Sequence, residues 1–582
     1  MKKMKLLSLL LILTMVFSLV TGCQGKAEST PESTSAAPQE SSISAAAPEE
    51  AAPETPAPEE ASAEEASLEE AEPLAELGPY EPNEEHTEIS VLFQCAGFFQ
   101  AFFPEGWNKS EWWTVFGEKT NTTVTLQEVS NQEWAENVNL LCASGDLPDV
   151  VTNMAAAYNG GLAAALRDDV IVDVAPYLHE YAPRYERAVS QDDYTLKTCL
   201  TDEGQMGAMY PIVEEPYPIT SGLWIRQDWL DELGKEIPTT PDELKTVLEL
   251  FRDNYGANVG FFQMIRAGAS TDEAGFTAEG VWNAFGPCNF FLDTDGTIQY
   301  GPMQDYYYDY IGYCKELASE GLFLTSSMTD RKANELFASG SIGVEGDSPD
   351  NVPSYLALLD PDEAAKAKLV PMTAIGEPTE FAPITSYISS DAGGNISIST
   401  NCENPKAVIQ AMDYLFTEEG ADLSSYGIEG LTYERNAEGK PEFTEVITNN
   451  PDGIPVRAVL GYYCNPGLPG YIDYARNQNS WDDVQKSSFG VWEKAYTGSS
   501  QTVNINALTL TQEEQDAISV YRSDMITYVT EWVNGVVFGD TVLDDASIAE
   551  FQNTMKSTMH IDDILKTYNT AYERFQERNL EQ

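Results

Sequence analysis

Histidine and paired cysteines are scarce in this chain. Three histidines occur in 582 residues, and each stands alone. Because histidine is the usual general base and the most frequent metal ligand, Ser–His or Cys–His catalysis and histidine metal sites have little support. The eight cysteines are widely spaced and form no Cys-x-x-Cys pair. This spacing indicates neither a zinc site nor a disulfide framework.

Positive charge is also scarce. The chain has 32 lysines and arginines against 94 aspartates and glutamates, for a net charge of −62. Residues 88–582 alone hold 77 acidic and 28 basic residues. Such an excess repels anionic polymers, so we expect no nucleic-acid partner. We attribute the acidity to solubility outside the cell rather than to a cationic ligand.

The first 22 residues have the parts of an export signal. Three lysines precede a mostly apolar stretch, 6–20, which is too short to span a bilayer comfortably. Its end, Leu19-Val20-Thr21-Gly22-Cys23, resembles the lipobox of bacterial lipoproteins. That resemblance implies cleavage before Cys23, lipidation of its thiol, and a protein anchored on the outer face of the cell membrane. The alternative is an ordinary signal peptide with Cys23 incidental.

The segment after Cys23 has few of the large apolar and aromatic residues that form a hydrophobic core. Residues 24–87 contain seventeen glutamates, one lysine, no aspartate and no aromatic residue except Tyr80. Such a segment buries too little apolar surface to offset its ordering entropy. We therefore predict that 23–87 is a lipidated cysteine with a disordered acidic linker, and that the folded domain is 88–582.

Strands and helices alternate from residue 88 onward. The stretches "HTEISVLFQC" and "NTTVTLQEV" are typical of strands, and a helix is expected between them at 111–120. This β-α-β order predicts a parallel sheet. A second helix follows with Trp134, Val138 and Leu141 on one face, and then a strand at 149–152.

Several helix ends carry capping signals. In "DELGKEIPTTPDELK", Gly234 occupies the position of a helix C-terminal glycine, and Thr240 to Glu243 form a capping box with proline at the first helical position. In "ISISTNCENPKAVIQ", Asn404 is expected to cap a helix that begins at Pro405.

Four stretches together resemble family 1 extracellular solute-binding proteins, the sugar-capturing subunits of ABC importers. They are "LCASGDLPDVV", "YPIVEEPYPITSGLWIRQDWLDELGKEIPTTPDELKTVLELF", "ELFASGSIGVEGD" and "ISISTNCENPKAVIQAMDYLFTEEG". Further on, "YGIEGLTYERNAEGKPEF" and "ILKTYNTAYERF" resemble the larger oligosaccharide-binding lipoproteins of Gram-positive bacteria within that family. The resemblance spans about residues 90 to 578.

The resemblance implies an α/β fold, two-lobed and periplasmic-binding-protein-like (type II), with discontinuous lobes joined by hinge crossovers. Lobe one is expected at about 88–212 and 393–430, and lobe two at about 213–392 and 431–582. The crossovers are expected near Met209 to Glu215, Ser386 to Gly394 and Gly427 to Leu431.

In function, the resemblance implies a monomeric cell-surface lipoprotein that captures a sugar or oligosaccharide between its lobes and delivers it to ABC transporter permease subunits. We expect this ligand to be a neutral oligosaccharide. It implies no enzyme activity and no cofactor. Three rival classes stay open. A membrane-anchored glycoside-active enzyme would need only two suitably spaced carboxylates, a peptide-binding transport lipoprotein would differ in ligand, and a structural surface protein would need no cleft.

A sugar site needs aromatic rings for the C–H faces of the sugar and polar groups for its hydroxyls. The aromatic candidates in loops and at crossovers are Trp107, Tyr217, Trp282, Tyr462, Tyr463 and Trp481. The polar candidates are Asp149, Asn153, Glu214, Arg226, Asn289 and Asp347. Arg226 is equally compatible with an ion pair to Asp228.

The stretch "FLDTDGTIQYG" has two interpretations. Asp293 to Gly296 could be part of a calcium loop, but the glutamate expected later in such a loop is replaced by Gln304. Asp-Gly between alternating residues is the usual signal of a tight hairpin, so we predict a hairpin and no metal site.

Overall fold

The computed structural model describes residues 77–95, 102–213, 222–256, 261–262, 285–322, 338–349, 352–373, 375, 388, 394–464, 467–473, 476, 478–479, 481–496 and 505–580. Cys23, Glu214, Tyr217 and Trp282 lie outside these residues, as do the export signal and most of the linker.

The first sheet has four strands, in the order β11 (Ile396–Ile398), β3 (Val150–Thr152), β1 (Thr87–Cys95) and β2 (Thr122–Ser130). β1 pairs in parallel with both β2 and β3, whereas β11 is antiparallel to β3. The predicted helix between β1 and β2 is α2 (Glu111–Thr120). The predicted β-α-β unit is therefore confirmed.

Both faces of the first sheet are buried, as expected when helices cover a parallel sheet. Alternate residues of β1, such as Val91 and Phe93, enter the larger core, which we call the first core, and Leu92 points into a smaller cluster behind the sheet. The first core also receives side chains from α2, α5 (Leu178–Tyr181), α6 (Pro183–Val189), α7 (Asp193–Cys199), α14 (Pro405–Asp413), α15 (Glu418–Ser425) and α17 (Val456–Tyr463). The smaller cluster receives them from α3 (Trp134–Ser144) and α4 (Gly161–Arg167).

The second sheet also has four strands, in the order β10 (Leu369–Pro371), β5 (Gly222–Arg226), β9 (Val344–Asp347) and β6 (Phe261–Phe262). β5 runs antiparallel to both of its neighbours, and β6 is parallel to β9. Trp224 lies on the face covered by α12 (Val352–Leu358) and α18 (Asp483–Tyr496), where it meets Trp492 edge to face with ring centroids 5.4 Å apart.

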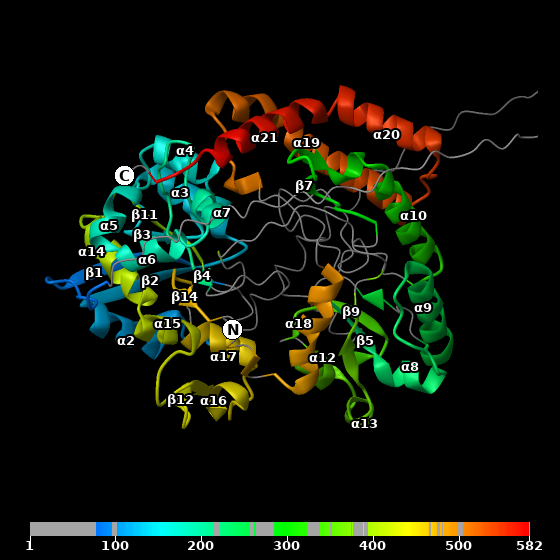
Figure 1. The fold of residues 1–582 in the computed structure, drawn as a ribbon, viewed down its shortest axis with the longest axis horizontal. Helices are drawn as coiled ribbons and strands as arrows, with labels where there is room; N and C mark the ends of the chain where they lie inside the picture. The colour runs from blue at the N-terminus through cyan, green and yellow to red at the C-terminus, as the bar shows by residue number, and fades with distance from the viewer. Residues whose placement is uncertain are drawn as a thin grey trace, which may run out of the picture. The chain divides into compact units, whose positions relative to one another are not determined.

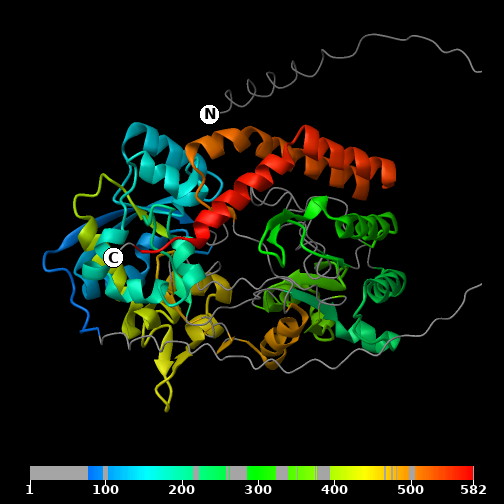
Figure 2. The same cartoon turned by 45° about the horizontal axis from the view of Figure 1, so that its top comes forward.

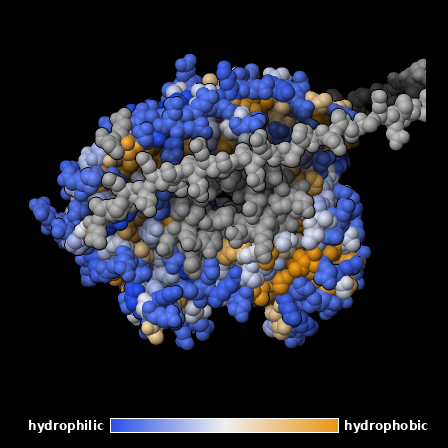
Figure 3. All heavy atoms as spheres, in the orientation of Figure 1, coloured by the Kyte–Doolittle hydropathy of each residue, from blue (hydrophilic) through white to orange (hydrophobic). Residues whose placement is uncertain are grey.

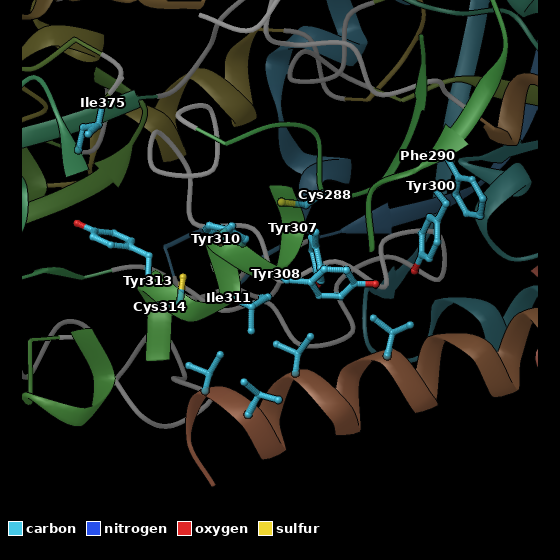
Figure 4. Close-up of a cluster of buried hydrophobic side chains, with 14 of the residues drawn as sticks. Cys288, Phe290, Tyr300, Tyr307, Tyr308, Tyr310, Ile311, Tyr313, Cys314 and Ile375 are labelled. Atoms are coloured by element: carbon cyan, nitrogen blue, oxygen red, sulfur yellow. The ribbon is translucent and has the colours of Figure 1, made fainter. Parts of the chain in front are cut away.

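The other face of the second sheet contributes to the second core, the largest hydrophobic cluster of the described chain. Its helices are α8 (Gln227–Leu233), α9 (Pro241–Tyr255), α10 (Asp305–Ser319), α19 (Gln512–Val537), α20 (Asp545–Ser557) and α21 (Ile561–Gln576). Figures 1 and 2 show the three C-terminal helices, α19 to α21, as a layer next to α10. Figure 4 shows Ile311 of α10 directed toward α19. The ring of Tyr308 meets that of Trp532 in α19 edge to face, with centroids 6.1 Å apart.

Three segments that run between the sheets lie side by side. β4 (Ile212–Val213) pairs in parallel with β14 (Tyr471–Ile472), and Ile388 forms an antiparallel bridge to Ile212. Ile212 and Ile388 belong to the stretches in which we expected the first two crossovers, Met209 to Glu215 and Ser386 to Gly394. The third was expected near 427–431, but the chain then forms β12 (Tyr433–Arg435), β13 (Pro441–Phe443), α16 (Glu445–Thr448) and α17 before β14.

Residues of that later stretch belong to the first core. Tyr462 and Leu468 are buried there, so the expected division at residue 430 does not separate the two cores. The physical reason is burial, because Tyr462 finds its apolar partners on the first sheet's helices and not on the second sheet. The structure places the last crossing after β14.

The predicted linker also ends earlier than expected. Tyr80 donates a hydrogen bond to the carbonyl of Gln410, and its ring meets Tyr414 with centroids 5.3 Å apart. Asn83 donates through Nδ2 to the carbonyl of Ala407 and through its backbone N–H to the carbonyl of Thr120. Residues 78–86, which we assigned to the linker, thus lie along the first core.

The helix caps follow their local signals. Thr240 accepts a hydrogen bond from the backbone N–H of Glu243, and Asn404 accepts one from that of Ala407. Gly234 ends α8 with a φ of 62°, which glycine adopts without steric cost. The Glu243 carboxylate differs from the expected box, because it accepts from the backbone and hydroxyl of Thr239.

The anchoring of residues 78–86 predicts a stability difference between two truncations. Both remove the linker, but removal of residues 1–86 also deletes the hydrogen bonds of Tyr80 and Asn83, whereas removal of 1–76 keeps them. At about 0.5–1.5 kcal/mol for each bond, the longer truncation is expected to lower the free energy of unfolding by about 2–4 kcal/mol. Urea denaturation of the two proteins measures this difference, and equal stabilities would contradict the anchoring.

Candidate functional site

The carboxyl-terminal edge of the first sheet carries a group of amide side chains. β1 and β3 end there, and the antiparallel β11 begins there. Gln94 lies near the end of β1, Asn153 follows β3, and Asn395 precedes β11. Ligands of open α/β sheets bind outside the carboxyl ends of the strands, which makes this amide cluster the candidate ligand site.

The Asn153 side chain is held in place by its neighbours. Its Nδ2 donates to Oε1 of Gln94 at 2.9 Å, and its backbone N–H donates to the carbonyl of Asn395 at 2.9 Å. Trp134 donates from Nε1 to the Asn153 carbonyl at 3.3 Å. Asn153 has a φ of 46°, in the left-handed region that asparagine tolerates.

Gly394 leaves the space that the Asn153 amide occupies. A Cβ atom at position 394 would lie 2.8 Å from Oδ1 of Asn153. Asn395 is the next residue in the chain, and its Oδ1 is buried with no hydrogen-bond partner among the described residues. An unpaired buried acceptor is costly, and a ligand hydroxyl would satisfy it.

The predicted aromatic ligands near this edge are mostly covered by protein. The Trp107 side chain is 3% exposed and donates from Nε1 to the carbonyl of Gly461 at 3.2 Å. Phe103 stacks on Tyr462 with ring centroids 3.9 Å apart and planes 4° from parallel. Burial raises the pKa of the Tyr462 phenol to about 12, so this phenol stays protonated at neutral pH.

The half-buried rings of this aromatic group are Phe103 and Tyr463. Tyr463 meets Tyr462 edge to face at 5.0 Å. Trp481 is buried elsewhere, where it stacks on Phe489 with centroids 5.1 Å apart. Sequence reasoning selected the larger rings and missed Phe103, because a ring's exposure depends on partners far along the chain.

Asp149 does not join the amide cluster. It precedes β3 and so lies at the amino-terminal edge of the sheet, opposite Asn153. Its Oδ2 accepts hydrogen bonds from the backbone N–H and the hydroxyl of Ser90, at 2.8 and 2.5 Å. These bonds tie β1 to the start of β3, which is a structural task.

Arg226, the last residue of β5, forms ion pairs with two carboxylates. It donates through two nitrogens to Asp228, at 2.8 and 2.6 Å, and through Nη2 to Glu363 in α13 (Pro361–Ala364) at 2.8 Å. Its guanidinium also lies 4.2 Å from the ring centroid of Trp229. Of the two interpretations of Arg226, the structure supports the ion pair.

Two predicted polar residues, Asp347 and Asn289, lie outside the first sheet. Asp347 is the last residue of β9 and pairs with Gly222, the first residue of β5. Asn289 is buried just before β7 (Phe290–Leu292), and its Oδ1 has no hydrogen-bond partner in the described part of the chain. Neither is placed against the amide cluster by a described contact.

The end of β14 carries another hydrogen-bonded group. Asp473 accepts from the phenol of Tyr426 at 2.5 Å, and its backbone N–H donates to Oγ of Ser425. Arg476 donates from Nη1 to the carbonyls of Ser424 and Ser425, the last residues of α15. Burial, with the Asp473 hydrogen bond, raises the pKa of Tyr426. This group fastens the last crossing segment to the first core.

The hairpin predicted at Asp293 to Gly296 is present, because β7 pairs antiparallel with β8 (Ile298–Tyr300). Asp293 accepts through Oδ1 from the backbone N–H groups of Asp295 and Thr297, between β7 and β8. Its other oxygen accepts from Gln299. Across the described ranges, no group of three or more histidine, cysteine or acidic side chains is arranged to hold a metal ion.

A separate pocket of about 480 Å³ opens on the first core's surface. Pro82 and Lys119 line it and precede β1 and β2, so it lies toward the strand edge opposite Asn153. Its other lining residues are Tyr80, Tyr414, Thr417, Glu418, Glu419, Asp422 and Arg435. The coloured surface in Figure 3 is predominantly hydrophilic, in keeping with the chain's charge. None of the described helices is long and apolar enough to cross a membrane.

The sequence matches the protein family described as "Bacterial extracellular solute-binding protein" over residues 96–422. Among curated proteins, it is 26% identical over 203 residues to the fructooligosaccharide ABC transporter substrate-binding protein FusA of Streptococcus pneumoniae, covering 33% of this chain and 37% of FusA. It is 24% identical over 330 residues to the lipoprotein LipO of Bacillus subtilis, covering 54% of this chain and 62% of LipO. The matched segments therefore span less than two thirds of these relatives.

Solved structures share the fold over a longer stretch. The alginate-binding protein AlgQ2 without calcium aligns with a TM-score of 0.65 and 20% identity, covering 84% of this chain and 99% of AlgQ2. FusA of S. pneumoniae in complex with kestose aligns with a TM-score of 0.64 and 17% identity, covering 84% and 99%. The expected α/β solute-binding-protein fold is thereby confirmed.

The geometry at Arg226 predicts a structural role. Replacement Arg226→Met leaves Asp228 and Glu363 without their buried partner, so the free energy of unfolding is expected to fall by about 3–5 kcal/mol. Lys119→Met removes an exposed ion pair to Glu419 and is the matched control, with an expected loss of under about 1 kcal/mol. Chemical denaturation measures both, and equal losses would refute the structural role.

Proposed function

Because the chain belongs to the bacterial extracellular solute-binding protein family, we propose that it captures an oligosaccharide and presents it to an ABC transporter permease. The observation that carries this proposal is the amide cluster of Gln94, Asn153 and Asn395 at the carboxyl-terminal strand edge. Amides both donate and accept hydrogen bonds, as sugar hydroxyls require. The substrate-binding role of FusA, as its name states it, supports the same class of ligand.

The ligand we propose is neutral. The three side chains of the cluster carry no charge, and Oδ1 of Asn395 is available to accept a hydrogen bond from a donor such as a hydroxyl. Arg226 and Arg476, which end β5 and follow β14, are engaged with carboxylates or helix carbonyls and so are poor candidates to bind a uronate. A neutral ligand distinguishes this chain from the relative YtcQ, named for polygalacturonan and rhamnogalacturonan binding.

Binding is proposed to occur between two lobes, each built on one of the two sheets. The crossing strands β4 and β14 and residue 388 would serve as the hinge. A ligand that contacts both lobes favours the closed arrangement and shifts the population toward it. Such a protein holds its ligand in the ground state and has no need to stabilise a transition state, so we propose no enzymatic activity.

The amide cluster predicts the effect of Asn153→Gly. Glycine keeps the left-handed backbone and removes only the amide, so folding is preserved while a ligand hydroxyl loses its partner. Affinity for a neutral oligosaccharide is expected to fall by about 1–3 kcal/mol, which is roughly 5- to 160-fold. Calorimetry with neutral gluco-, manno-, xylo- and fructo-oligosaccharides identifies the ligand, and galacturonate oligomers are the charged comparison.

Asn254→Ala is the control for this test, because that exposed amide donates to the carbonyl of Leu250 in its own helix. Affinity is expected to change little between about 50 and 500 mM salt, since a neutral ligand is not steered by screened charges. The oligosaccharide should be recovered intact after incubation. Binding of only the charged oligomers, or an unchanged affinity in Asn153→Gly, would refute this ligand site.

We further propose that Cys23 carries the lipid that keeps the protein at the outer face of the cell membrane. The lipobox-like stretch Leu19 to Cys23 supports this, as does the lipoprotein name of the relative LipO. In Cys23→Ser, the acyl chains have no attachment site, so the protein is expected in the culture medium. Fractionation with immunodetection measures this, with Cys142→Ser as the control. Retention of Cys23→Ser in the membrane fraction would refute lipid anchoring.

A further inference from the structure

Asp202 lies in the loop after α7 and binds two arginines, Arg574 in the C-terminal helix α21 and Arg578 just after it. Its Oδ2 accepts from Nε of Arg574 at 2.6 Å, and its Oδ1 accepts from Nε of Arg578 at 2.8 Å. The neighbours Leu200 and Met206 are buried in the first core. The cluster therefore ties the loop after α7 to residues more than 370 positions away.

The partner helix belongs to the other core. Tyr568, Ala571 and Phe575 of α21 are buried in the second core. Arg574 and Arg578 project from this same end of the helix toward Asp202. The three ionic side chains thus bridge the two cores at a place separate from the crossing strands.

Arg578 is fully enclosed at this junction, with a side chain that is 0% exposed. Its Nη1 donates to the carbonyls of Lys197 and Ala507, at 3.0 and 2.7 Å. Its Nη2 donates to Oγ1 of Thr509 at 2.9 Å. A buried guanidinium is tolerated only when its donors are satisfied. Moving α21 away from α7 would break these hydrogen bonds and leave the Arg578 charge unpaired, which is strongly unfavourable.

Arg574 extends the junction to the start of α19. It binds Glu514 in bidentate fashion, at 2.9 and 2.7 Å, and also donates to the carbonyl of Thr509. Glu514 in turn closes the capping box of α19 with Thr511. Bidentate arginine–carboxylate pairs fix relative orientation as well as distance. The two long C-terminal helices and the first core's loop are therefore held in one arrangement.

We propose that the Asp202–Arg574–Arg578 cluster is a brace, which fastens the C-terminal helices to the first core while those helices pack in the second. Within the described residues, the brace and the crossing strands are then two separate places at which the two cores are joined. A rigid rotation that keeps both junctions intact turns about the line between them. The brace thereby restricts the relative motion of the two cores to one axis, and it lies in part beyond the family-matched residues 96–422.

The test compares Asp202→Asn with Glu316→Gln in the ligand-free protein. Glu316 of α10 pairs with Lys245 of α9, and its side chain is about half exposed. Loss of the Glu316 charge therefore leaves the brace intact. Hydrogen–deuterium exchange is the measurement. In Asp202→Asn, the amides of residues 193–206 and 561–580 are expected to exchange about tenfold faster or more, while those of α9 and β1 keep their rates. Glu316→Gln should match the wild type throughout.

Solution scattering gives a second readout, because loss of the brace is expected to raise the radius of gyration and broaden the distance distribution. Arg574→Lys keeps the positive charge, loses the bidentate geometry and should show a smaller change of the same kind. A uniform acceleration of exchange over the whole chain would overturn the brace, because it would show only a loss of global stability. Unchanged exchange at both segments would overturn it equally. No sugar is present, so the result is independent of the proposed ligand.

Discussion

Parallel pairing of β1 with β2 and β3 is the constraint on which the candidate site depends. Parallel strands that share a sheet end at the same edge, so residues separated by about sixty positions, such as Gln94 and Asn153, become neighbours. The antiparallel β11 then brings Asn395 to that edge from still further along the chain. The amide cluster is thus a product of strand order, and Gly394 matters because it leaves the room that the Asn153 side chain fills.

Buried charge organises the parts that the sheets do not. Asp413 accepts from two backbone N–H groups and the guanidinium of Arg184, which holds α14 against α6. Burial raises the pKa of this carboxyl, and the arginine and backbone donors oppose the rise. The Asp202 brace uses the same chemistry between cores. In both places a fully bonded ionic group fixes one arrangement, because any displacement leaves a charge unsatisfied in a low-dielectric interior.

Local signals in the sequence predicted local structure well. The caps at Thr240 and Asn404, the left-handed Gly234 and the Asp293 hairpin depend on residues within a few positions of each other, and all are found. The candidate site contains Asn153, which we selected from the sequence, and two amides, Gln94 and Asn395, which we did not select. A polar Gln94 directly after the apolar run Val91 to Phe93 was a signal of exposure at that edge, and Asn395 directly before β11 was another.

The family was identified by the resemblance of several sequence stretches. The sequence by itself also determined the alternation of strands and helices, the acidic segment before the folded domain and the helix ends, since these follow from composition, periodicity or short-range hydrogen bonding. Only the tertiary structure decided which aromatic rings are buried, where the chain last crosses between the two sheets and which arginines form ion pairs. Trp107 is buried because its indole meets Gly461, and Asp202 is bridged because α21 returns to α7. Such contacts join residues hundreds of positions apart, and their burial depends on how whole elements pack, which no local pattern encodes.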